Sequence, residues 1–68
     1  MKTKKTAREL EAMVSANTGV PATRVKVFPD KTYGWRAVVY VAPQDAETAQ
    51  QRAAETAQEL RTRFDLED

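Results

Sequence analysis

Residues 24–41, RVKVFPDKTYGWRAVVYV, decide the fold, because two alternating stretches flank a segment rich in turn-forming residues. Apolar residues recur at every second position in 24–28 and again in 35–41, which is the period of a β-strand with one buried side. The segment 29–34 is too long for a two-residue hairpin turn, so it predicts an exposed loop in which Gly34 takes a positive φ. We therefore expect an antiparallel β-hairpin.

The alternation also divides the hairpin into two faces. The apolar face, which we expect to meet the core, consists of Val25, Val27, Trp35, Ala37, Val39 and Val41. The opposite face, called the open face below, consists of Arg24, Lys26, Phe28, Arg36, Val38 and Tyr40. It interleaves three cations with aromatic and aliphatic side chains, and it is the candidate binding surface of the chain.

Helices are predicted on both sides of the hairpin. Thr6 and Glu9 have the spacing of a capping box, and Asn17, Gly19 and Pro21 favour an end to the helix, so the first helix covers roughly 7–17. Pro43 suits the first turn of a second, longer helix. The apolar positions of that helix keep to one face, and we expect their small side chains to accommodate the Trp35 ring: Ala46, Ala49, Ala53, Ala57, Leu60 and Phe64.

These elements predict one small α+β domain over residues 1–68, of order α-β-β-α, with two helices packed on one face of the hairpin. The predicted core is Leu10, Met13, Val14, Val25, Val27, Trp35, Val39, Leu60 and Phe64. Residues 1–5 and 65–68 are expected to be disordered.

Length and composition favour a partner chain. A chain of 68 residues buries too little surface to be comfortably stable alone, and without Cys or His it has neither a disulfide nor ligands for structural zinc. We expect a symmetric homodimer. Pairing of the 35–41 strand edges into a four-stranded sheet is the favoured arrangement, and stacking of the open faces is the alternative.

The sequence offers no catalytic constellation. Ser15 is the only serine and has no candidate base, and the pair Glu55 and Glu59 lies on a helix face that also carries Arg52 and Arg63. Neither of the two glycines stands in a phosphate-binding loop. We therefore expect a protein that is not an enzyme and has no cofactor or metal. No targeting signal or membrane span is apparent, so we expect a cytoplasmic protein without membrane contact.

The charge distribution does not decide which kind of partner the chain binds. Residues 1–36 carry eight cations and three anions, a balance of +5, whereas residues 37–68 carry three cations and seven anions, a balance of −4. The favoured interpretation is a non-catalytic protein-interaction module that acts as a homodimer or binds another protein. The alternative is a nucleic-acid-binding protein, because rings that stack on bases and cations that meet phosphates form single-strand platforms.

Overall fold

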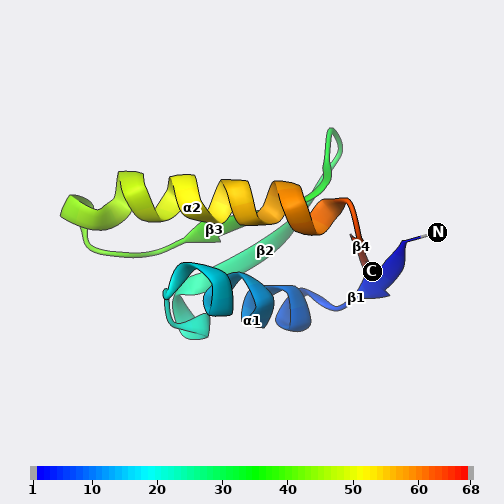
Figure 1. Ribbon diagram of the computed structural model, residues 1–68, viewed down its shortest axis with the longest axis horizontal. Helices are drawn as coiled ribbons and strands as arrows, with labels where there is room; N and C mark the ends of the chain where they lie inside the picture. Colours follow the sequence, from blue (N-terminus) through cyan, green and yellow to red (C-terminus); the bar gives the residue numbers. More distant parts are fainter. Residues whose placement is uncertain (1, 68) are drawn as a thin grey trace.

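The computed structural model describes residues 2–67, in which two helices and four strands form an α+β fold with two small sheets (Figure 1). Along the chain the order is β1, α1, a short 3₁₀ turn, β2, β3, α2 and β4. Helices α1 and α2 lie side by side on one face of the β2–β3 hairpin, with α1 against β2 and α2 against β3. No helix of residues 2–67 covers the other face of the hairpin.

Helix α1, Ala7–Thr18, begins and ends as its sequence predicts. Thr6 Oγ1 accepts a hydrogen bond from the Glu9 amide at 3.1 Å, and Glu9 Oε1 accepts one from the Thr6 amide at 3.0 Å. Gly19 follows in the left-handed conformation with φ 78°, where its amide donates to the Ser15 carbonyl. Both ends of the helix therefore use local signals.

The hairpin consists of β2, Val25–Asp30, and β3, Gly34–Val39. Its strand bounds differ from the expected ones. Residues 29 and 30 belong to the first strand, so the turn contains only residues 31–33, and the second strand ends before Tyr40. Gly34 has the predicted positive φ, at 92°. Pro29 is tolerated in β2 because an edge strand does not need its amide for the ladder.

Helix α2, Pro43–Arg61, has Pro43 in its first turn as predicted. Its buried residues are Ala53, Ala57 and Leu60, which share a core cluster with the fully buried Trp35. Alanines on the helix thus leave room for the large ring on the sheet.

Seven of the nine residues expected in the core are buried. Met13 and Phe64 are only partly buried, because Met13 lies at the rim of α1 and Phe64 has left the helix for β4. The complete buried set is Leu10, Val14, Val20, Val25, Val27, Trp35, Ala37, Val39, Ala53, Ala57 and Leu60. Neither helix of residues 2–67 is long and apolar enough to cross a membrane.

The ends of the chain differ from the expectation of disorder. Strand β1, Thr3–Lys5, pairs in parallel with β4, Phe64–Leu66, and the two form a second sheet beside the hairpin (Figure 1). The Thr3 amide donates to the Arg63 carbonyl at 3.2 Å, and the Glu67 amide donates to the Lys5 carbonyl at 2.7 Å. The expected order α-β-β-α therefore lacks one strand at each end, β1 and β4. Residues 1 and 68, also expected to be disordered, lie outside the described residues.

Candidate functional site

The open face is assembled by the register of the hairpin. Lys26 lies opposite Val38, and Phe28 lies opposite Arg36. Beyond the strand ends, the Tyr40 amide donates to the Arg24 carbonyl at 2.8 Å, which places these two residues across from each other as well. The structure thus brings together all six predicted residues as three cross-strand pairs, and each pair holds one cation and one apolar or aromatic residue.

The rings of the open face are accessible. Phe28 is 38% exposed and Tyr40 is 52% exposed, whereas Val38 is half-buried. The Arg36 guanidinium lies 5.8 Å from the centroid of the Phe28 ring, within the range of a cation–π contact. The face is therefore a mixed cationic and aromatic surface with little continuous apolar area.

One anionic residue completes the face and was missed by sequence reasoning, which assigned it to the loop. Asp30 continues the alternation that places Phe28 on this side, and it closes the turn by accepting from the Thr32 amide at 2.8 Å and the Tyr33 amide at 3.0 Å. The Tyr33 and Thr32 amide bonds, with smaller contributions from nearby arginines, hold the pKa of Asp30 below its ordinary value. The open face consequently carries three positive charges and one negative charge at neutral pH.

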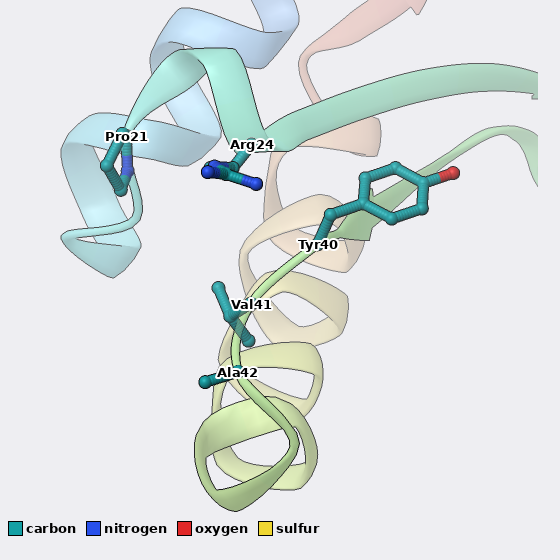
Figure 2. Close-up of a pocket in the computed structure, with 5 residues that line it drawn as sticks. All are labelled: Pro21, Arg24, Tyr40, Val41 and Ala42. Carbon is teal, nitrogen blue, oxygen red and sulfur yellow. The ribbon is translucent and has the colours of Figure 1, made fainter.

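At one end of the open face, Arg24 and Tyr40 line a shallow groove with Pro21, Val41 and Ala42 (Figure 2). Figure 2 shows that Arg24 comes from the segment before β2 and Tyr40 from the segment after β3, with the tyrosine hydroxyl directed away from Val41 and Ala42. The groove is thus an extension of the open face beyond the paired strands.

Side chains from the helices occupy the outer edges of the hairpin. At the β2 edge, Glu11 of α1 accepts from the Val27 amide at 3.0 Å, and Pro29 has no amide hydrogen to offer. At the β3 edge, Gln50 of α2 accepts from the Val39 amide at 3.2 Å and donates to the Ala37 carbonyl at 3.1 Å. The Gln50 amide therefore makes the pair of bonds that a neighbouring strand would make. Such contacts protect an edge strand from further pairing.

A second cationic and aromatic cluster lies at the turn end of the β3 edge, and nothing in the sequence pattern pointed to it. Arg61, the last residue of α2, donates through Nη1 to the Trp35 carbonyl at 2.8 Å. Its guanidinium lies 4.9 Å from the centroid of the Tyr33 ring. Tyr33 itself is 63% exposed. The cluster depends on where α2 ends relative to the turn, which only the folded arrangement shows.

Within residues 2–67, no three acidic side chains converge in the way that a metal site requires. Comparisons of the chain with protein-family models, with curated proteins and with solved structures found no match.

Proposed function

We propose that the protein is a non-catalytic binding module whose open face binds single-stranded nucleic acid. The observation that carries the proposal is the pairing of a cation with an apolar or aromatic residue at three successive cross-strand positions. Rings on such a surface stack on bases and cations contact phosphates, without any need for a particular sequence.

The length of the open face suits a short nucleic-acid strand. From Arg24, which ends the 3₁₀ turn, through the first residues of β2 to Phe28, the chain advances about 13 Å, at roughly 3.3 Å per residue. A stacked nucleic-acid strand advances about 3.4 Å per nucleotide, so the face covers about four nucleotides. Phe28 and Tyr40 lie toward opposite ends of the face, where each ring can hold a separate base.

The homodimer is the second candidate, and the partial exposure of Phe28, Val38 and Tyr40 favours it. Because Gln50 and Glu11 already occupy amide and carbonyl groups of the hairpin edges, such a dimer would stack the open faces. Stacking would bring three cations of each copy together against only one acid of each, and like charges held close destabilise an interface. An anionic partner avoids this repulsion between like charges, so we rank nucleic acid first.

Salt dependence of binding tests the proposal. We expect the 68-residue chain to bind a fluorescein-labelled thymidine oligonucleotide, measured by fluorescence anisotropy. With three phosphates neutralised, affinity should fall about 20-fold between about 50 and 200 mM salt, because the slope of log affinity against log salt concentration is close to −0.7 per phosphate contact for single strands.

Lys26→Ala should reduce the magnitude of this salt slope by about 0.7, because it removes one phosphate contact. Arg52→Ala is the matched control, because Arg52 is exposed on α2 and lies away from the open face. Absence of binding at about 50 mM salt would refute the proposal.

A single substitution separates the two candidates. Val38→Lys adds a fourth cation to the open face, so it should strengthen oligonucleotide binding, whereas it should dissociate a dimer held by stacked faces. Sedimentation equilibrium near 100 μM, well above a micromolar dissociation constant, reports the mass of both proteins. A wild-type dimer that Val38→Lys converts to monomer, together with no gain in oligonucleotide affinity, would favour the homodimer.

A further inference from the structure

The Tyr33–Arg61 cluster is held in place by the fold. Arg61 contacts the Trp35 carbonyl at 2.8 Å, and its guanidinium also lies 5.8 Å from the Trp35 ring centroid. Since Trp35 is fully buried, the guanidinium is anchored to the core while the Tyr33 ring that it contacts stays largely in solvent. The cluster therefore presents a positioned ring and a positioned cation.

A groove joins this cluster to the open face. The groove follows the β3 edge and is lined by Arg36 and Val38 of the open face and by Tyr33 and Arg61 of the cluster. Its one acidic lining residue among those described is Asp30, whose carboxylate accepts from two turn amides. Arg36 of the open face and Arg61 of the cluster therefore line the same groove.

We infer that this groove is a second subsite for single-stranded nucleic acid, in which Tyr33 stacks on a base and Arg61 contacts a neighbouring phosphate. The inference rests on the proposed function and extends it. A nucleic-acid strand longer than the open face would continue past Arg36 and cross the β3 edge into the groove. Arginine suits this position, since its planar guanidinium can stack on a ring and still donate to phosphate oxygens.

The subsite predicts a length-dependent effect of Tyr33→Ala. An oligonucleotide of about four nucleotides fits on the open face alone, whereas one of about twelve reaches the groove. Tyr33→Ala should weaken binding of the longer oligonucleotide at least about 5-fold, the lower end of the range for one stacked base, and should leave binding of the shorter one within about two-fold. Tyr33→Phe, which keeps the ring, should bind both as the wild type does.

Labelled thymidine oligonucleotides of both lengths, titrated with each variant, give the test, and circular dichroism verifies that each variant is folded. Equal weakening of both lengths, or no weakening of the longer one, would overturn the second subsite while leaving the open face as the binding surface. If the wild type binds neither length, the proposed function itself fails, and the subsite fails with it.

Discussion

The two sheets of the molecule are stabilised in different ways. The β2–β3 hairpin has strands of six residues, and five of its side chains are buried in the core. The β1–β4 pair has strands of three residues, and none of its side chains is fully buried. The hairpin is therefore stabilised by full burial and by edge contacts from both helices, whereas the terminal pair is stabilised by its own backbone hydrogen bonds and by the partial burial of Phe64 and Leu66.

Among residues 2–67, one hydrogen bond connects the two sheets directly, because Trp35 Nε1 donates to the Phe64 carbonyl at 3.1 Å. Phe64 and Leu66 of β4 also pack, partly buried, against the core. The polar contacts of the terminal pair include Lys2 to Asp65 at 3.6 Å and the Lys5 ammonium 5.5 Å from the Phe64 ring centroid. Exposed ion pairs contribute little stability. We therefore expect the hairpin to determine global stability and the terminal pair to open locally.

The largest expected effect comes from Trp35→Ala, which removes the largest buried side chain of the hairpin. Truncation of a buried tryptophan costs about 3–5 kcal/mol, which is close to the whole stability of a domain of this size. We expect an unfolded protein by circular dichroism. Trp35→Phe, which keeps a ring but loses the bond to the Phe64 carbonyl, should remain folded and lose less stability. A Trp35→Ala protein that unfolds cooperatively, with a free energy of unfolding within about 1 kcal/mol of the wild-type value, would contradict the central role of the hairpin.

A smaller effect is expected at the hairpin edge. Gln50→Ala removes both bonds to the β3 backbone, which should cost about 1–2 kcal/mol in urea denaturation. Because the Val39 amide and Ala37 carbonyl then become available to another strand, the variant should also self-associate at high concentration in sedimentation experiments. Gln51→Ala is the control, since the exposed Gln51 side chain donates a hydrogen bond only to Glu55 among the described residues, at 3.4 Å. A Gln50→Ala protein that stays monomeric and fully stable would show that the edge needs no protection.

The hairpin and both helices could be predicted from the sequence because each has a local signal. Period-two alternation identified the strands and the open face, and the Thr6–Glu9 capping box and Pro43 identified the helix starts. The strand bounds were less accurate, because Pro29 and Asp30 are turn-forming residues that the hairpin nevertheless accommodates at the ends of its ladder.

The terminal pair and the edge contacts could not be predicted, because their signals are not local. Three polar residues such as Thr3–Lys5 show no alternation, and their partners lie at the other end of the chain. Gln50 and Arg61 resemble ordinary polar residues of a helix rich in alanine and glutamine, and their roles follow only from where α2 lies on β3. The Tyr33–Arg61 subsite was missed for the same reason.

The smallest expected effect, Glu67→Pro, tests whether the terminal pair opens independently of the hairpin. Proline removes the amide that donates to the Lys5 carbonyl at 2.7 Å, while Glu67→Ala keeps that amide and serves as the control. By hydrogen exchange, we expect faster exchange of the β1 and β4 amides in the proline variant and unchanged protection of the β2 and β3 amides. The free energy of global unfolding should fall by less than about 1 kcal/mol, because the hydrogen bond lost lies outside the unit that determines it. If Glu67→Pro instead accelerates exchange in both sheets equally, the bond from Trp35 to Phe64 couples them into one cooperative unit.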